Sequence, residues 1–202
     1  MDDALRAELL RRVEKDQAAR GSLDSDAMVE VDGENLPWLK ELIAVGGWPG
    51  ASRTGADGAH AAWLLVQHMD ADPAFQRQCL DLLAAAVADG EATPADLAYL
   101  TDRVLLAEGQ QQVYGTQVTR RGGAWVPRHL GDPAGVDERR MAAGLGPLAQ
   151  YLQGFADRAL PAAWLNCAGC GARVPFEPPE VDEPVTVRCA GCGLQTTLGA
   201  TR

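Results

Sequence analysis

The sequence predicts a mainly α-helical protein: a multi-helix domain with a small β-hairpin, followed by a small C-terminal β zinc ribbon. Three observations support this fold class. Apolar residues recur at helical spacing over most of the first 160 residues, a strand-forming segment interrupts them, and four cysteines cluster near the C-terminus. We therefore expect a helical domain over residues 1–160, with the hairpin near 111–129, and a zinc ribbon over 166–202.

The first third of the chain predicts two helices separated by a loop. Residues 3–20 repeat leucine and valine at helical spacing, and Gly21 then ends the pattern. Residues 21–34 are polar, which predicts a loop, and a short helix follows over residues 37–44. The glycine-rich stretch over residues 48–58 is typical of a long loop.

The central and later helices are marked by their boundary residues. Two of them begin at an N-cap residue followed by proline, a pair that starts helices because proline has no N–H to leave unsatisfied. Glycine ends most of them. The expected helices cover residues 59–69, 73–88, 94–108, 135–143 and 146–158, and residues 159–165 are expected to form a short connector.

A strand-forming segment lies between the expected helices. Residues 111–129 contain valines, a tyrosine and a tryptophan, which favour β-structure. The sequence at residues 121–123 is Arg-Gly-Gly, which is typical of a turn. The segment therefore predicts a β-hairpin.

Two nearly identical cysteine motifs predict a metal centre. The sequence C-A-G-C-G begins at Cys167 and again at Cys189, and 18 residues separate Cys170 from Cys189. Paired C-x-x-C motifs at this spacing are typical of zinc sites, since each tight turn directs two thiolates to the same side. The two motifs together supply a tetrahedral shell of four sulfurs. Cys167, Cys170, Cys189 and Cys192 are the predicted ligands, and the segment resembles the zinc ribbon family.

A structural zinc ion is the interpretation that the motif favours. Four protein ligands fill the coordination shell, so no position remains for a substrate or a reactive water. Redox chemistry at a C-x-x-C pair is the alternative, but thiol exchange does not need two matched motifs. The fifth cysteine, Cys79, lies on an apolar helix face and is expected to pack in the core.

The charge of the chain excludes several classes of function. The formal net charge is −10, and residues 166–202 contribute almost none of the excess. An acidic surface argues against proteins that coat nucleic acid or anionic membranes. The N-terminus has no apolar signal core, and no segment is apolar enough to span a membrane. We therefore expect a bacterial, cytoplasmic protein.

The expected helix over residues 59–69 carries polar side chains among apolar neighbours. At 100° per residue, His60, Gln67 and His68 lie on one side of this helix. The two histidines are eight residues apart, which is too far for one mononuclear metal site on a single helix. A general base or acid at His60 or His68 is one interpretation, and hydrogen bonding within the core is the other.

Polar residues later in the chain offer partners for these histidines. Arg103 interrupts an apolar helix and is the candidate for binding an anionic group, so it joins His60 and His68 as a candidate catalytic residue. Gln67, Asp102, Tyr114 and Gln117 are the candidate substrate-binding residues. Together they suggest a pocket for a small polar or anionic substrate.

Several short motifs resemble a bacterial family known only as a domain of unknown function. The likeness covers about residues 35–155 and implies that the polar residues belong to a shared site or scaffold; the ribbon lies outside it. It implies no reaction. The motifs are AHAAWLLVQH at 59–68, DPAFQ at 72–76, AYLTDRV at 98–104, YGTQ at 114–117, and VDERR with GLGPL between 136 and 148.

Three classes of function remain open. The first is an enzyme that uses the pocket, although no recognisable nucleophile motif, phosphate-binding loop or dinucleotide fingerprint supports it. The second is a non-catalytic module that binds a protein or a small molecule, with structural zinc. A DNA-associated regulator is third, and the negative charge opposes it.

Overall fold

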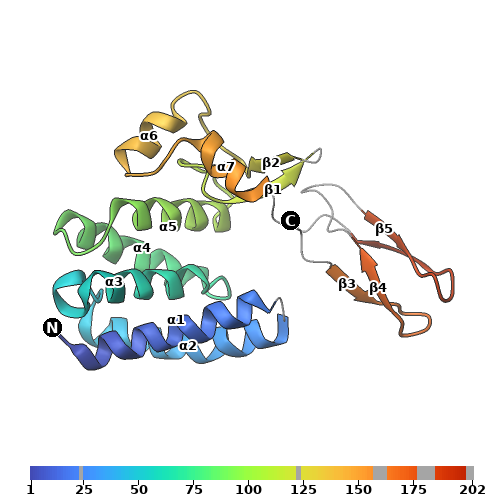
Figure 1. The fold of residues 1–202 in the computed structure, drawn as a ribbon, viewed down its shortest axis with the longest axis horizontal. Helices are drawn as coiled ribbons and strands as arrows, with labels where there is room; N and C mark the ends of the chain where they lie inside the picture. Colours follow the sequence, from blue (N-terminus) through green and yellow to red (C-terminus); the bar gives the residue numbers. More distant parts are fainter. Residues whose placement is uncertain (23–24, 122–123, 157–162, 177–184, 199–202) are drawn as a thin grey trace. The chain divides into compact units, whose positions relative to one another are not determined.

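The computed structural model describes residues 1–22, 25–121, 124–156, 163–176 and 185–198, and it confirms the predicted fold class (Figure 1). The chain divides into two compact units. The first unit consists of Met1–Gln117 with His129–Pro147, and the second consists of Val118–Arg128 with Leu148–Arg202. No helix in the described ranges is long and apolar enough to cross a membrane.

The first unit is a bundle of helices arranged around α3. This helix packs against α1, α4 and α5, and α1 also packs against α2 (Figure 1). A shorter helix, α6, follows in the same unit. The helices are α1 (Asp3–Gly21), α2 (Ser25–Gly46), α3 (Ala51–Gln67), α4 (Pro73–Ala88), α5 (Pro94–Ala107) and α6 (Val136–Ala142).

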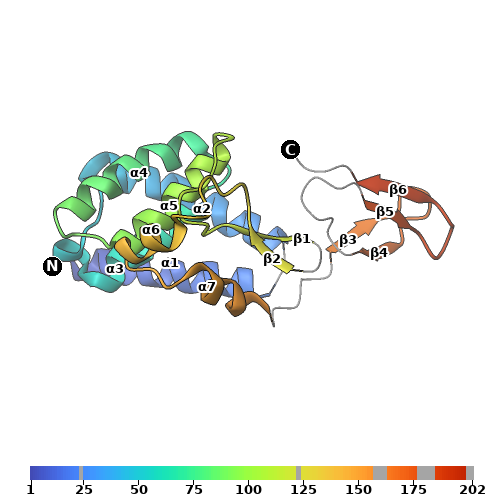
Figure 2. The same cartoon turned by 90° about the horizontal axis from the view of Figure 1, so that it is seen from above.

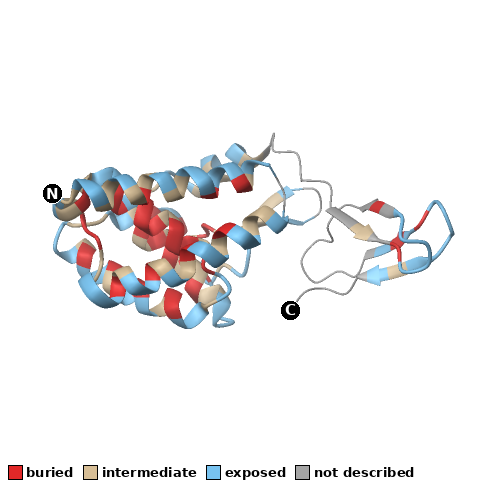
Figure 3. Cartoon of the chain, turned by 90° about the horizontal axis from the view of Figure 1, so that it is seen from below, coloured by how far each residue is buried: buried red, intermediate tan, exposed pale blue. Residues whose placement is uncertain are grey.

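The hydrophobic core of the first unit lies between these helices, as the buried residues in Figure 3 show. Leu9, Leu65, Leu83 and Leu100 are completely buried. Cys79 is also completely buried, and burial raises the pKa of its thiol to about 12. This cysteine therefore packs as an apolar residue, as expected.

Helix α2 corrects the prediction of a loop over residues 21–34. Helix begins at Ser25 and continues through Pro37 to Gly46. Val31 and Leu39 are buried, and they lie two turns apart on the face that packs into the bundle. The polar residues misled the prediction because they pair with α1: Lys15 Nζ lies 2.6 Å from Glu34 Oε2.

Helix α3 begins earlier than expected, inside the predicted glycine-rich loop. It starts at Ala51, and its regular geometry is broken only at Gly55, where φ is 76° and ψ is 163°. A residue with a side chain adopts this conformation at a cost, whereas glycine does not. The loop prediction was therefore wrong from Ala51 onward. The glycines of this stretch suggested a loop, whereas Gly55 only kinks the helix.

The second unit contains the predicted hairpin, which is shorter than the segment that predicted it. Strands β1 (Val118–Arg121) and β2 (Ala124–Pro127) pair antiparallel. Helix α7 (Leu148–Ala156) packs against β2, and the ring centroids of Trp125 and Phe155 lie 5.4 Å apart. Residues 111–117, which were expected in the hairpin, belong to the first unit.

Two further hairpins carry the cysteine motifs (Figure 2). Strand β3 (Ala163–Asn166) pairs with β4 (Arg173–Phe176), and β5 (Val185–Arg188) pairs with β6 (Gln195–Leu198). Strand β3 lies partly in the segment that was predicted to be a connector. One cysteine motif occupies the turn of each hairpin, so the two motifs have equivalent places in the fold.

Candidate functional site

The four predicted ligand cysteines lie close together in the structure. Their four Sγ atoms are all within 4.8 Å of one another. The shortest separations join the two motifs, with 3.4 Å between Cys167 and Cys192 and 3.6 Å between Cys170 and Cys189. A tetrahedral ion with metal–sulfur bonds of about 2.3 Å holds its sulfurs about 3.8 Å apart. The cluster therefore has the dimensions of a four-thiolate metal site.

The backbone of the two motifs explains why their sequences are the same. Cys167 N donates to Ala172 O at 2.9 Å, and Gly171 N donates to Cys167 O at 2.8 Å. The second motif repeats both bonds at the same lengths from Cys189 and Gly193. Gly171 and Gly193 have φ of 72° and 76°, a conformation that glycine adopts without strain. The glycine after each second cysteine is thus required by the turn.

Backbone amides favour thiolates in this cluster. Hydrogen bonds from Gly169 N and Cys170 N lower the pKa of the Cys167 thiol to about 6. Leu194 N also acts to lower the pKa of Cys192, but the neighbouring sulfurs outweigh it and raise that pKa to about 12. Four crowded thiols cannot all ionise without a compensating cation, and a bound metal ion would supply that charge.

His68, which is partly buried, forms a pair with a buried aspartate that the sequence prediction did not include. Its Nδ1 atom lies 2.9 Å from Asp16 Oδ2, and Asp16 is 1% exposed. Burial acts to raise the pKa of Asp16, but the hydrogen bond and charge of His68 outweigh it and the net pKa is lowered. The Asp16 carboxylate is therefore ionised, and its contact with Nδ1 holds the orientation of the imidazole ring.

Arg20 joins the same cluster from one turn further along α1. Its Nε atom lies 2.8 Å from His68 Nδ1 and 3.0 Å from Asp16 Oδ1, and its terminal nitrogen lies 2.5 Å from Asp32 Oδ1. Burial raises the pKa of Asp32, and the charge of Arg20 opposes that effect. The guanidinium is thus held between two carboxylates.

Gln67 and Arg103 form a second, separate cluster. Arg103 Nε donates to Gln67 Oε1 at 2.8 Å, and its terminal nitrogen lies 2.8 Å from Asp70 Oδ2. Gln76 Nε2 donates to Asp70 Oδ1 at 3.2 Å. Arg103, the predicted anion-binding residue, is therefore already paired with a carboxylate.

His60 faces α5 instead of joining His68. Its Nδ1 atom lies 3.0 Å from Asp96 Oδ1, and its side chain is 55% exposed. Burial raises the pKa of Asp96, and the charge of His60 opposes that effect. The imidazole also stacks on Trp63, with 4.7 Å between ring centroids. His60 is accordingly a surface histidine supported by a buried carboxylate.

Asp102 holds the loop that precedes the hairpin. Its two carboxylate oxygens accept hydrogen bonds from the backbone N–H groups of Val113, Tyr114 and Thr116, all between 2.8 and 3.0 Å, and from the Thr116 hydroxyl. Asp102 is completely buried. A carboxylate that satisfies three loop amides fixes the backbone, and this accounts for its position in an apolar helix.

Tyr114 and Gln117 also contribute backbone atoms to loop contacts. Arg140, which is 1% exposed, donates to Tyr114 O at 2.8 Å. Gln117 N donates to Gln112 Oε1 at 2.8 Å, and Gln117 O accepts from Gln112 Nε2 at 2.9 Å. The two predicted substrate-binding residues thus lie in a loop that Asp102, Gln112 and Arg140 hold in place.

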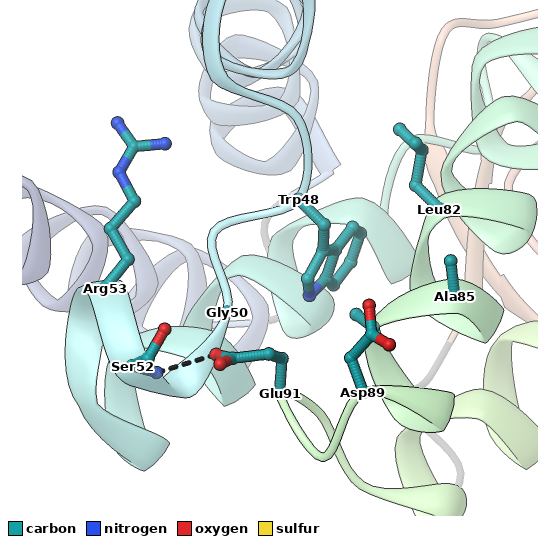
Figure 4. Close-up of a pocket in the computed structure, with 9 residues that line it drawn as sticks. Trp48, Gly50, Ser52, Arg53, Leu82, Ala85, Asp89 and Glu91 are labelled. Atoms are coloured by element: carbon teal, nitrogen blue, oxygen red, sulfur yellow. Dashed lines mark hydrogen bonds between the residues drawn. The ribbon is translucent and has the colours of Figure 1, made fainter.

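A cavity lies elsewhere in the first unit, between the loop that precedes α3 and the end of α4 (Figure 4). Its volume is about 370 Å³. Residues from both helices and from the loop after α4 line it: Trp48, Gly50, Ser52, Arg53, Leu82, Ala85, Ala86, Asp89 and Glu91.

The structure therefore groups the predicted polar residues in several local clusters, and the lining of this cavity contains none of them. His68 differs from His60 and Gln67 because it lies just beyond the end of α3, with φ −95° and ψ 3°. The sequence prediction missed Asp16, Asp96 and Glu91. Asp16 had a detectable signal, since it continues the apolar face of α1 seven residues after Leu9.

Comparison with known proteins identifies one family. The family model described as "Family of unknown function (DUF6624)" matches residues 3–160. No curated protein and no solved structure matches the chain. The match covers the predicted helical domain and ends before the cysteine motifs.

Proposed function

The chain belongs to this family of unknown function, and from that premise we propose that it is a zinc-binding protein with a structural four-cysteine centre. The observation that carries the proposal is the cluster of four Sγ atoms within 4.8 Å of one another. Thiolate sulfur in a tetrahedral arrangement suits Zn²⁺ better than Mg²⁺ or Ca²⁺, which prefer oxygen ligands. Cys167, Cys170, Cys189 and Cys192 would hold the ion.

The bound ion would supply stability to the ribbon and no reaction chemistry. Four ligands leave no open position for a substrate. Among the described side chains of the ribbon, Val174 and Val187 are buried beside Cys167 and Cys189, so the proposed ion would lie against this apolar cluster. We propose that the ribbon is a non-catalytic interaction module for a protein or small molecule, in a reducing compartment such as the cytoplasm.

Metal analysis of purified protein tests this proposal. We expect about one zinc ion per chain in the wild type and a loss of most of it in the Cys170→Ser variant. Cys79→Ala is the matched control, because it removes a cysteine outside the cluster and should keep full zinc content. The proposal would be refuted if wild-type protein, expressed with adequate zinc, contained no zinc.

General acid–base chemistry at His68 is a second candidate function. The supporting observation is the Asp16–His68 pair, in which a buried carboxylate orients the imidazole through its Nδ1 atom. Arg20 would contribute positive charge near a small polar or anionic substrate. Arg103 and Arg20 are each already paired with a carboxylate, which weakens the case that either binds an anionic substrate. The binding module is therefore our first choice.

A panel of small carboxylate and phosphate esters tests this second candidate. We expect hydrolysis by the wild type, a loss of at least about tenfold in His68→Asn, and retention in His129→Asn, which changes an exposed histidine of the same unit. Equal rates in the two variants, or no hydrolysis by the wild type, would leave only the zinc-binding module.

A further inference from the structure

The cavity beside Trp48 has chemistry that neither the cysteine centre nor His68 explains. It lies at the N-terminal end of α3, whereas His68 follows the C-terminal end of that helix. A helix of this length places the two ends about 25 Å apart. An inference about this cavity therefore stands independently of the functions proposed above.

Glu91 is fixed in the cavity by three hydrogen bonds. Its N–H donates to Ala86 O at 2.8 Å, its carbonyl accepts from Ala51 N at 2.9 Å, and its Oε2 accepts from Ser52 N at 2.7 Å. The bonds from Ser52 lower the pKa of the Glu91 carboxyl, so it is ionised at neutral pH. A Cβ atom at Gly50 would lie 2.5 Å from Glu91 Oε2, so the close approach of this carboxylate requires glycine there.

This arrangement makes the cavity a poor site for an anion. The backbone N–H groups at the start of a helix ordinarily attract anions, but here the first two donate to Glu91 and the next two donate to Gly50 O. The negative end of α4 lies on the other side, where Asp89 is the C-cap residue. Both features favour a positively charged ligand.

The one positive residue of the lining is directed elsewhere. Figure 4 shows the Arg53 side chain extending away from Trp48 and Asp89. Its guanidinium lies 3.5 Å from Gly46 O and 3.8 Å from Asp2 Oδ2. The two carboxylates of the lining are thus not neutralised by a side chain within the cavity.

Trp48 gives the cavity an aromatic wall. The side chain is partly buried and packs against the main hydrophobic cluster. Figure 4 shows its indole beside the same opening as Asp89 and Glu91, with Leu82 and Ala85 across from it. An aromatic face next to two carboxylates is a favourable environment for an organic cation.

We propose that this cavity binds a guanidinium group, stacked on Trp48 and hydrogen-bonded to Asp89 and Glu91. Guanidinium is planar, stacks on aromatic rings, and presents several N–H donors in one plane to carboxylates. A quaternary ammonium could not donate these hydrogen bonds. The volume of about 370 Å³ accommodates a small guanidino compound or the side chain of an arginine in a peptide.

Calorimetric titration of the full chain with methylguanidinium tests the proposal. We expect saturable binding, no binding of the neutral isostere methylurea, and affinity weakened by roughly three- to tenfold in Asp89→Asn and in Trp48→Leu. Asp81→Asn is the matched control, because it removes an exposed carboxylate of α4 that is outside the lining. Each variant is first checked for an unchanged melting temperature.

Three results would overturn the proposal: no saturable binding by the wild type, equal binding of methylurea, or equal weakening in Asp81→Asn and Asp89→Asn. If Trp48→Leu unfolds, the test rests on Asp89→Asn, because Asp89 is exposed and its substitution removes no core contact. A parallel titration with a short arginine-containing peptide identifies the source of the group. Tighter binding of the peptide indicates a protein ligand, and equal or weaker binding indicates a free guanidino compound.

Discussion

The helical unit and the ribbon differ in what we expect to stabilise them. The helical unit buries complete side chains from its helices, including Leu9, Leu65 and Leu100. Among the ribbon side chains that the structure describes, the buried cluster consists of two valines and two cysteines, with Leu165 packed against them. Hydrophobic burial is enough for the first, and we expect a bound metal ion to add to it in the second, because a two-hairpin module removes little apolar surface from water.

This difference means that the two regions should respond to different perturbations. A change in the core should act on the helical unit and leave metal content unchanged. Removal of the metal should act on the ribbon and leave the helices intact. Three experiments test this separation and a fourth compares two carboxylates within the helical unit, beginning with the largest expected effect.

Metal removal should unfold the ribbon selectively. Structural zinc supplies on the order of 10 kcal/mol to small four-ligand modules, so a strong chelator should collapse the amide NMR signals of residues 163–176 and 185–198. Helical circular dichroism should change little. Retention of the ribbon signals after metal removal has been verified would show that the valine core is sufficient.

Truncation of Leu65 should affect only the helical unit. Leu65→Ala removes a completely buried side chain and is expected to lower the free energy of unfolding by about 2–5 kcal/mol, measured by urea denaturation. Val29→Ala, at a residue that is 72% exposed, should change it by less than about 0.5 kcal/mol. Zinc content should be unchanged in both, and a loss of zinc in Leu65→Ala would contradict the separation.

Loss of the Asp102 carboxylate should release the loop before the hairpin. Asp102→Ala leaves three backbone N–H groups without their acceptor and should cost about 3 kcal/mol. Hydrogen exchange should accelerate at Val113, Tyr114 and Thr116 and remain unchanged in the ribbon. If the amides of the ribbon also exchanged faster, the two regions would be coupled.

Asp16 and Asp96 should have opposite effects on the stability of the helical unit at acidic pH. The pKa of Asp16 is lowered in the folded state, so its stabilisation is present above the ordinary value of 3.8 and is lost as the pH falls through the folded value. The pKa of Asp96 is raised, so its contribution is present below 3.8 and is lost as the pH rises through the folded value.

Melting temperatures at a series of pH values check this last prediction. Asp16→Asn should flatten the decline of stability in acid, and Asp96→Asn should steepen it relative to the wild type. The changes should be smaller than those from Leu65 or Asp102. A shift of the same sign in both variants would contradict the opposite pKa shifts of Asp16 and Asp96.

The sequence predicted the elements whose boundaries carry a chemical signal. Asp72 accepts from Phe75 N and Thr93 accepts from Asp96 N, so the starts of α4 and α5 were predicted correctly. The helix predicted over residues 37–44 lies within α2, but the first half of α2 was missed because its polar residues pair with α1, and pairing across helices is invisible in local periodicity. The start of α3 was missed because Gly55 resembles a loop signal.

The candidate sites also differ in how well the sequence predicts them. The cysteine cluster was predictable because one short motif fixes both the turn and the direction of its thiolates. The polar residues of the helical unit were expected to share a pocket, yet the two histidines pair with aspartates of α5 and α1, 36 and 52 residues away in the sequence. The cavity at Trp48 was not predicted, because its lining is assembled by the packing of α3 against the end of α4.

The division of the four ligands between two hairpins has a consequence for the rate of metal exchange. Each motif contributes two sulfurs, so a bound ion could stay on one hairpin while the other dissociates. The 18 residues between Cys170 and Cys189 keep the detached hairpin close by. Loops of similar size close in about 10–100 ns. Reattachment at this speed would compete with escape of the ion, so the metal would be retained for far longer than either motif alone could hold it.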